Sequence, residues 1–242
     1  MHYPRIDRPD SIFLGMAAKI IAVASSKGGV GKTTTSVSLA SHWASRGRDA
    51  YLVDADHQGA GSASSWMART QPIPHLDWID LRVEVDRTPG ASMAAAIDAL
   101  RSVDEGYDFI VVDTPPDQES PVLSQVCAVA DLVVVVAGQD FDESQAAVDT
   151  INATVRPAGT RGVVVMTMAD VRSISFTNEL RHAIEAQAIE TLPTPIRHYV
   201  VMRYSKMHGQ LPHEMTGDNA SNARADIGNV AEEIESHIAA IE

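Results

Sequence analysis

The chain has 242 residues, which suits one α/β domain whose sheet is covered on both faces. A net charge of −13 disfavours a broadly basic surface for nucleic acid, although a local basic patch can act within an acidic protein. The single cysteine, Cys127, excludes a disulfide framework and a cysteine-only metal cluster within one chain. Since no run of about 20 uninterrupted apolar residues occurs, we expect no membrane span and a cytoplasmic protein.

The first 17 residues read as an irregular leader, with Pro4, Pro9 and mixed charges. The apolar segment 12–24 ends in Ala-Val-Ala, as a signal peptide does. Lys19 interrupts this segment, however, and cleavage would remove the strand that leads into a glycine-rich loop. We therefore expect an irregular leader over 1–17 and a single folded domain over 18–242.

Apolar runs and helical periodicities alternate along the rest of the chain. This alternation favours an α/β fold with a doubly wound, mostly parallel sheet and helices on both faces. Residues 196–210 read as a basic stretch with a loop around Gly209. The expected strands are 19–25, 50–53, 76–81, 107–113, 131–137 and 162–168, and the expected helices are 33–46, one around Trp66, 91–103, 142–155, 176–189 and 223–241.

A glycine-rich loop stands between the first strand and the first helix. Strand, turn and helix start, in this order, form the context of a phosphate-binding loop. The glycines let successive backbone N–H groups surround a polyphosphate, at a helix N-terminus that adds partial positive charge. The alternative is a glycine turn with an incidental lysine. The loop reads Ser26-Lys27-Gly28-Gly29-Val30-Gly31-Lys32-Thr33-Thr34.

The residue types of this loop predict how it holds a nucleoside triphosphate. Lys32 is placed to reach the β- and γ-phosphates, the Thr33 hydroxyl to ligate Mg²⁺, and Thr34 to contact the α-phosphate. The predicted nucleotide-binding residues are Lys27, Gly28, Gly29, Val30, Gly31, Lys32, Thr33 and Thr34.

Three aspartates follow predicted strands at the sheet edge where this loop lies. Asp113 ends a continuously apolar strand, and we interpret it as the acid that holds Mg²⁺ directly or through water. Asp54 and Asp56 end the second strand, so both carboxylates point toward the phosphates if the strand geometry continues. Capping of a following helix is the alternative for Asp113 and for Asp54.

The sequence K-G-G-x-G-K-T-T resembles the deviant Walker A loop of the ParA/MinD ATPase superfamily. Ser26 replaces the first glycine of the common pattern, and Lys27 is an additional lysine. The resemblance implies that ATP and Mg²⁺ are bound and that two protomers form a nucleotide-sandwich dimer. In that dimer Lys27 reaches the partner's ATP and contributes to catalysis with Lys32. A surface lysine of no consequence is the alternative.

The stretch Asp54-x-Asp56-x-Gln58-Gly59 resembles the switch region of ParA partition ATPases. The resemblance implies that Asp56 positions or polarises the attacking water and that Asp54 supports Mg²⁺. His57 stands where the family usually has proline, and the residues between Gly59 and Ser62 resemble a short insertion.

Later segments resemble the shorter ParA proteins, and the resemblance covers most of residues 19–214. Asp131-Leu132-Val133, residues 194–197, Gly209 and Glu214 carry it. Residues 137–139 stand where relatives often have proline. We expect the base to bind near Met168 and Asp170, with a contribution from residues 193–197.

A basic cluster follows this region, and it includes two histidines, His198 and His208. It predicts non-specific, salt-sensitive contacts with DNA phosphates. A solvated helix face is an equal alternative. A dimer would double the patch, so ATP-dependent pairing could raise the DNA affinity. The predicted DNA-binding residues are Arg197, Arg203 and Lys206.

Together the motifs predict a small ParA-type partition ATPase, nucleoid-associated in the cytoplasm. The resemblance implies three partners, namely a second copy of the chain, non-specific DNA and a centromere-binding protein. A small-molecule ligase or kinase of the same superfamily is one alternative. A MinD-like positioning ATPase is another, although Glu232, Glu233, Glu235 and Glu242 make the final segment acidic, unlike a membrane-binding helix.

Overall fold

A computed structural model describes residues 18–56, 62–81, 92–102, 106–117 and 120–240, with the side chains of 98–102 excepted. The predicted leader, 1–17, lies outside the described residues. So do His57, Gln58 and Gly59 of the predicted switch region.

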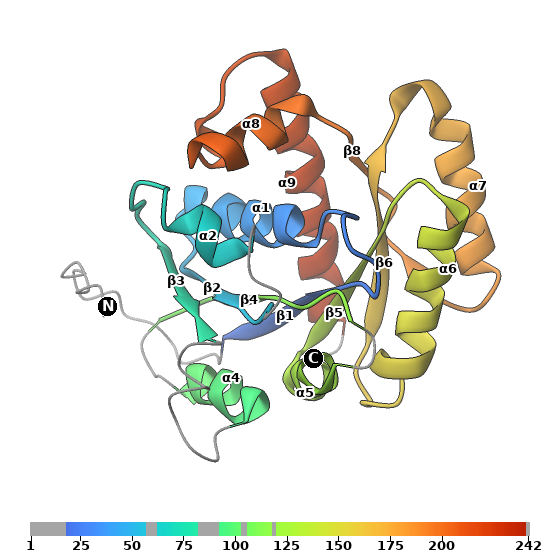
Figure 1. Cartoon of the computed structure of the whole chain (residues 1–242), viewed down its shortest axis with the longest axis horizontal. Coiled ribbons are helices and arrows are strands. Elements are labelled where there is room, and N and C mark those ends of the chain that lie inside the picture. Colours follow the sequence, from blue (N-terminus) through green and yellow to red (C-terminus); the bar gives the residue numbers. More distant parts are fainter. Residues whose placement is uncertain (1–17, 57–61, 82–91, 103–105, 118–119, 241–242) are drawn as a thin grey trace.

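The core of the fold is a parallel sheet in the order β3-β2-β4-β1-β5-β6-β7, with β8 paired to β6 (Figure 1). Every strand pair is parallel, which confirms the doubly wound α/β fold predicted from the sequence. The strands are β1 Lys19–Ala24, β2 Ala50–Asp54, β3 Leu76–Asp80, β4 Phe109–Asp113, β5 Leu132–Ala137, β6 Gly162–Ala169, β7 Glu190–Thr191 and β8 Ile196–Arg197.

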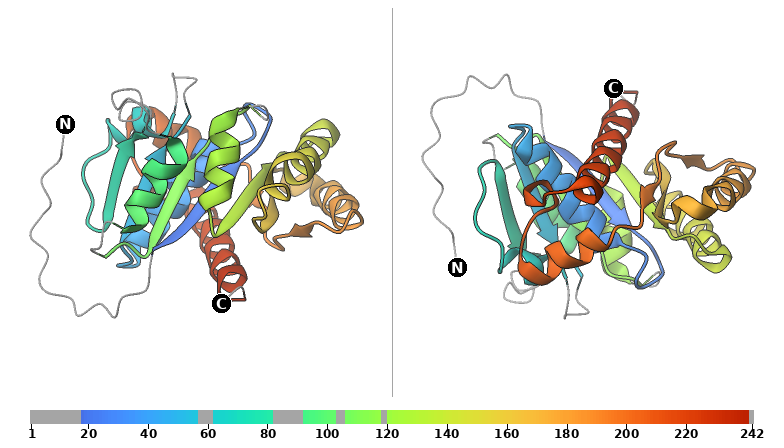
Figure 2. Two further views of the ribbon diagram at one scale, coloured as in Figure 1. Left: turned by 90° about the horizontal axis from the view of Figure 1, so that it is seen from below. Right: turned by 90° about the horizontal axis from the view of Figure 1, so that it is seen from above.

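Helices cover both faces of this sheet. The helices α1, α2 and α9 pack on one face, and α4, α5, α6 and α7 pack on the other. The two views of Figure 2 show α8 and α9 on the α1 side, and α4 and α5 on the opposite side. The helices are α1 Lys32–Ser45, α2 Ala63–Met67, α4 Met93–Ser102, α5 Pro121–Val129, α6 Phe141–Thr150, α7 Ile174–Glu185, α8 Val200–His208 and α9 Asp218–Ala239, with a π-helical turn η1 Ile151–Val155 and 3-10 turns η2 Val171–Ser173 and η3 Pro212–Glu214.

Burial explains why the central strands read as continuous apolar runs. Alternate residues of β1 face the two cores, with Ile21 in one and Ile20 in the other, and both are fully buried. A parallel strand between two helical layers needs apolar side chains on both of its faces. The pairing register also places Val23 and Asp54 opposite Asp113, so the carboxyl ends of β1, β2 and β4 meet at one edge.

Most predicted elements are confirmed, with three differences near the C-terminus. Residues 200–208 form α8, which is not among the expected elements although a helix face is the alternative for the basic cluster, and Gly209 ends this helix with φ 63° in the left-handed region. The helix α7 ends at Glu185, because the chain turns through Ala188 at φ 58° before β7. The last helix begins at Asp218, five residues before the predicted start, where an acidic side chain favours the first turn.

The helix α9 is docked on the core along its length. Its buried side chains face α1 and β8, and Trp43 Nε1 of α1 donates to Glu235 Oε1 at 2.7 Å. No helix among the described residues is long and apolar enough to cross a bilayer. The buried apolar face of α9 is Ala220, Ala223, Ile227, Val230, Ala231, Ile234 and Ile238.

Candidate nucleotide site

The predicted phosphate loop joins β1 to α1 at the carboxyl edge of the sheet. Gly29 and Gly31 have φ of 84° and 97°, values that residues with a Cβ atom rarely adopt. Gly31 is the N-cap residue of α1, so the first N–H groups of the helix open toward the loop. The structure therefore brings the predicted loop residues into an anion-binding conformation.

The two lysines of the loop lie in opposite environments. Lys32 is 7% exposed, and its Nζ donates to the carbonyl oxygen of Lys27 at 2.9 Å. Burial lowers the pKa of Lys32, although the carboxylates of Asp113 and Asp56 act in the opposite direction. The side chain of Lys27 is exposed at the loop's surface. Thus one lysine faces its own loop, and the other faces outward.

Asp113 is fully buried next to the start of α1. Its Oδ1 accepts from Ser36 Oγ at 3.0 Å, and it also forms a hydrogen bond with the Thr33 side chain. Burial raises its pKa to about 7. The nearby Asp54 and Asp56 carboxylates add to this rise, and the two hydroxyl hydrogen bonds oppose it. Near neutral pH such a carboxyl is divided between its protonated and ionised forms, and a bound cation would favour the ionised form.

The donor set around Asp113 fits Mg²⁺. Its Oδ2 is buried and has no hydrogen-bond partner among the described residues, and the Thr33 hydroxyl is adjacent. Mg²⁺ prefers oxygen ligands and is commonly held by one or two protein groups plus waters and substrate phosphates. Within the described part of the chain, no cluster of three or more His, Cys, Asp or Glu side chains could hold a metal. One carboxylate, one hydroxyl and the nucleotide's phosphates are sufficient for this ion.

Asp54 makes the contacts of the helix-capping alternative. It is fully buried, and its Oδ2 accepts from Ser64 N at 2.8 Å and from the Ser64 hydroxyl, at the first turn of α2. Its Oδ1 accepts from Asp56 N at 3.1 Å. Because β2 ends at Asp54, the strand alternation that would orient both carboxylates alike does not reach Asp56. The condition on which we expected both carboxylates to face the phosphates is therefore not met, although Asp56 still acts electrostatically on Lys32.

A pocket opens next to the phosphate loop. Thr34 and Thr35 of α1 form one wall, and Met168 at the end of β6 forms another. The third wall is β8 and α8, over residues 196–206. This position agrees with the predicted base site near Met168 and residues 193–197. Asp170 is not among the lining residues and forms an exposed ion pair with Arg172 at 2.6 Å.

The predicted DNA-binding residues do not form one exposed basic patch. Arg197 pairs with Asp226 of α9, through Nη2–Oδ1 at 2.6 Å and Nε–Oδ2 at 2.9 Å. Lys206 lines the pocket and is half-buried, and burial lowers its pKa. Arg203 alone of the three has an exposed side chain. The sequence suggested one patch because the three cations share a short segment. In the structure all three line the same pocket, but Arg197 is held in its ion pair and Lys206 is half-buried.

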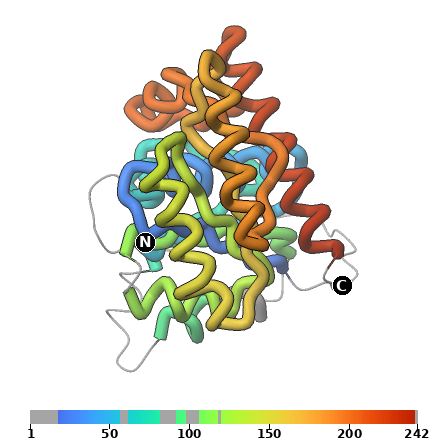
Figure 3. Tube along the Cα trace, turned by 90° about the vertical axis from the view of Figure 1, so that its right-hand side faces the viewer, coloured from blue at the N-terminus to red at the C-terminus, as the bar shows by residue number. Residues whose placement is uncertain are grey.

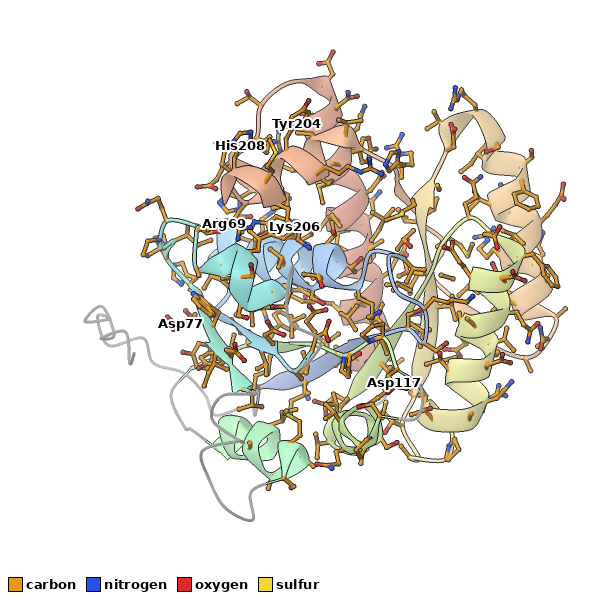
Figure 4. All side chains as sticks on the ribbon, viewed as in Figure 1. Arg69, Asp77, Asp117, Tyr204, Lys206 and His208 are labelled. Atoms are coloured by element: carbon orange, nitrogen blue, oxygen red, sulfur yellow. The ribbon has the colours of Figure 1, made fainter. Side chains whose placement is uncertain are left out.

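Contacts between α2 and α8 were not predicted from the sequence. Trp66 Nε1 donates to the carbonyl oxygen of Gln210 at 3.0 Å, and Arg69 Nη2 donates to that of Lys206 at 3.0 Å. Figure 4 shows Arg69 and Lys206 side by side below α8, with Tyr204 and His208 on the upper side of this helix in the view. Gly209 packs so closely that an added Cβ atom would lie 2.4 Å from the Arg69 carbonyl oxygen. No motif marks these residues; the glycine after the basic stretch is the only signal.

Comparisons with known proteins agree with this geometry. Residues 18–76 match a family described as an AAA domain. Maintenance of carboxysome distribution protein A (McdA) of Gloeobacter kilaueensis is 34% identical over 217 residues, covering 90% of this chain and 94% of that protein. The chromosome-partitioning ATPase Soj of Thermus thermophilus is 31% identical over 190 residues, covering 69% of this chain and 74% of that protein.

A solved structure shows the same fold. The septum site-determining protein MinD of Pyrococcus horikoshii, complexed with Mg-ADP, superposes with a TM-score of 0.70 at 18% identity, covering 90% of this chain and 96% of that chain. The identity and coverage of the McdA and Soj relatives, together with the phosphate loop and its buried aspartate, show that this chain belongs to the ParA/MinD family of ATPases, which includes McdA.

Proposed function

We propose that this ATPase is a partition switch. It binds MgATP, pairs with a second copy around the nucleotides, binds non-specific DNA as a pair, and is released when hydrolysis resets the pair. The observation that carries this proposal is the opposite placement of the two loop lysines. Lys32 is buried against its own loop, whereas Lys27 is exposed and available to a facing protomer.

Within one protomer, residues 27–34 surround the phosphates. Lys32 neutralises their charge, Thr33 and Asp113 hold Mg²⁺ with support from Asp54, and Asp56 orients the attacking water. Bound Mg²⁺ neutralises charge that develops on the phosphate oxygens. The Mg-ADP carried by the Pyrococcus horikoshii MinD structure supports this choice of cofactor. These roles require positioning and charge stabilisation and no covalent intermediate.

The proposed DNA contact depends on exposed cations. Arg203 is the strongest candidate, since its side chain is exposed, whereas Arg197 is paired with Asp226 and Lys206 is half-buried. Retention on DNA should weaken steeply with salt, because displaced counterions drive such binding. We place the protein on the nucleoid in the cytoplasm, where a centromere-binding partner would stimulate hydrolysis.

A second cargo is favoured by one comparison. The relative that matches over 90% of this chain is named for maintenance of carboxysome distribution, so the same switch could distribute a protein compartment. A membrane-positioning role of the MinD type finds less support, because the apolar face of α9 is buried against the core. A small-molecule ligase would not need an exposed Lys27.

The proposal is tested by sedimentation of the protein with MgATP, MgADP or no nucleotide, combined with hydrolysis assays with and without plasmid DNA. We expect a dimer with MgATP only, salt-sensitive DNA retention by that dimer, and loss of dimerisation-linked hydrolysis in Lys27→Ala. Turnover by a protein that stays monomeric in MgATP would overturn the proposal. A requirement for a carboxylic acid substrate would point to the ligase class instead.

A further inference from the structure

The residue before Lys27 is anchored to helix α6. Ser26 N donates to Thr150 Oγ1 at 3.3 Å, and Ser26 Oγ donates to the carbonyl oxygen of Ala146 at 3.2 Å. Thr150 is fully buried, and its hydroxyl also donates to the Ala146 carbonyl at 2.7 Å. These contacts join segments 120 or more residues apart, so the loop's first residues are fixed by a distant helix.

Thr150 ends α6 at an irregular place. The chain widens directly after it into the π-helical turn η1, in which Arg156 N donates to the Ile151 carbonyl at 2.9 Å. Such turns recur at functional sites. Figure 3 shows α6 beside α7 on the face that covers β5 and β6. The hydroxyl that reaches the phosphate loop therefore stands at the junction between two helical geometries.

The backbone of Lys27 is held from both sides. Its N–H donates to Ser25 Oγ at 3.3 Å, and its carbonyl oxygen accepts from Lys32 Nζ at 2.9 Å. Its side chain remains exposed, while Glu143, in the first turn of α6, lies within the field of its ammonium group. Helix α6 thus acts on the Lys27 region in two ways. It accepts hydrogen bonds from Ser26, and its Glu143 interacts electrostatically with the Lys27 ammonium group.

We propose that Thr150 and Ser26 are positioning residues that fix the backbone from which Lys27 projects toward the partner's nucleotide. This inference rests on the proposed function, because it gives Lys27 its target across the dimer. Ser26 stands where the common loop pattern has glycine, and its hydroxyl makes a hydrogen bond to α6 that glycine cannot make. If these hydrogen bonds only stabilised the fold, their loss would weaken nucleotide binding by the protomer and dimerisation to the same extent.

The test compares Thr150→Val, which removes only the hydroxyl, with Thr150→Ser, which keeps it. Thr177→Val is the matched control, since that buried hydroxyl has no hydrogen-bond partner among the described residues. Two quantities are measured on the full chain, namely MgADP affinity by calorimetry and the dimer dissociation constant with Mg²⁺ and a non-hydrolysable ATP analogue by sedimentation.

We expect Thr150→Val to weaken the dimer roughly 3- to 10-fold, the effect of one lost hydrogen bond, with MgADP affinity changed less than about twofold. Thr150→Ser and Thr177→Val should dimerise like the wild type. If Thr150→Val does not fold, Ser26→Ala carries the same expectation. If the wild type dimerises and Thr150→Val dimerises equally tightly, this inference alone is overturned. It is also overturned if Thr150→Val loses MgADP affinity in proportion to its loss of dimer affinity. A wild-type protein that stays monomeric overturns the proposed function instead.

Discussion

The phosphate side of the nucleotide site and the neighbouring pocket, which we propose as its base side, are built in different ways. The phosphate side consists of residues 25–36 and one aspartate from the neighbouring strand, joined by short contacts within the protein's centre. The base side is assembled from α1, β6, β8 and α8, and is stabilised by Asp226 of α9 and by α2. The residues of the phosphate side lie mostly in one short segment, although α6 and β6 also contact it, whereas the base side is built from elements that are distant in the sequence.

The largest expected effect breaks the phosphate side. Lys32→Ala removes the buried cation of the loop, so MgATP affinity should fall roughly 100- to 1,000-fold, the range for truncating a buried charge partner. Isothermal titration calorimetry measures it. Lys19→Ala, which changes a lysine at the start of β1, should bind MgATP normally. Equal affinity in both variants would mean that the loop does not grip the phosphates.

The next effect comes from removing the ion pair that supports the base side. Arg197→Ala leaves the Asp226 carboxylate, whose side chain is 6% exposed, without its guanidinium. Unfolding free energy should fall by about 2–4 kcal/mol, because a buried charge would lose its partner. Urea denaturation checks this. The exposed Arg203 supplies the control, since Arg203→Ala should change stability by less than about 0.5 kcal/mol. A similar loss of unfolding free energy in both variants would mean that the Arg197–Asp226 ion pair contributes no more to stability than an exposed arginine does.

The pH dependence of the unfolding free energy should report the titration of Asp113, the buried acid of the phosphate side. Because folding raises the pKa of Asp113 to about 7, the stability linked to its proton is present at low pH and is lost as pH rises through about 7. Without nucleotide, the unfolding free energy should decrease by on the order of 2 kcal/mol between about pH 5 and pH 7. Asp113→Asn should flatten this decline in urea titrations. An unchanged decline in that variant would assign it to other groups.

The smallest expected difference, the one between two glycine variants, sharpens the description of the base side. Gly209→Ala places a Cβ atom against the Arg69 carbonyl and also strains a left-handed residue. Gly159→Ala strains a similar residue, at φ 77°, with nothing within 4 Å of the added atom. Both variants should lose about 1 kcal/mol from backbone strain, and Gly209→Ala about 1–2 kcal/mol more. Thermal denaturation compares them. An equal loss of stability in both variants would show that the Arg69 backbone can shift away from the added Cβ atom at little cost.

The local character of the phosphate side explains why its residues could be predicted. Glycine spacing, Lys32 and Thr33 lie in one continuous segment, and an apolar run marks the strand that ends in Asp113. The role of Asp54 could not be settled in this way, because it depends on Ser64, ten residues further along, approaching its carboxylate.

The base side shows why the remaining features were not predictable. Pairing of Arg197 with Asp226 joins residues 29 apart through the docking of α9, and no spacing rule gives that contact. For α8 a helix face was only one of two equal alternatives, because this short segment offers few buried positions, Met202 and Ser205. Its stability comes from packing on α9 and from the left-handed stop at Gly209.

The order of the sheet also limits how copies of this chain can associate. Among the described residues, β3 pairs only with β2 and carries Asp77 and Asp80, and the opposite margin ends in the two-residue strand β7. Charged or very short outer strands resist recruitment of a further strand from another molecule. Growth of fibres by continuation of the native sheet is therefore disfavoured, and assembly is left to the helical and loop surfaces around the nucleotide.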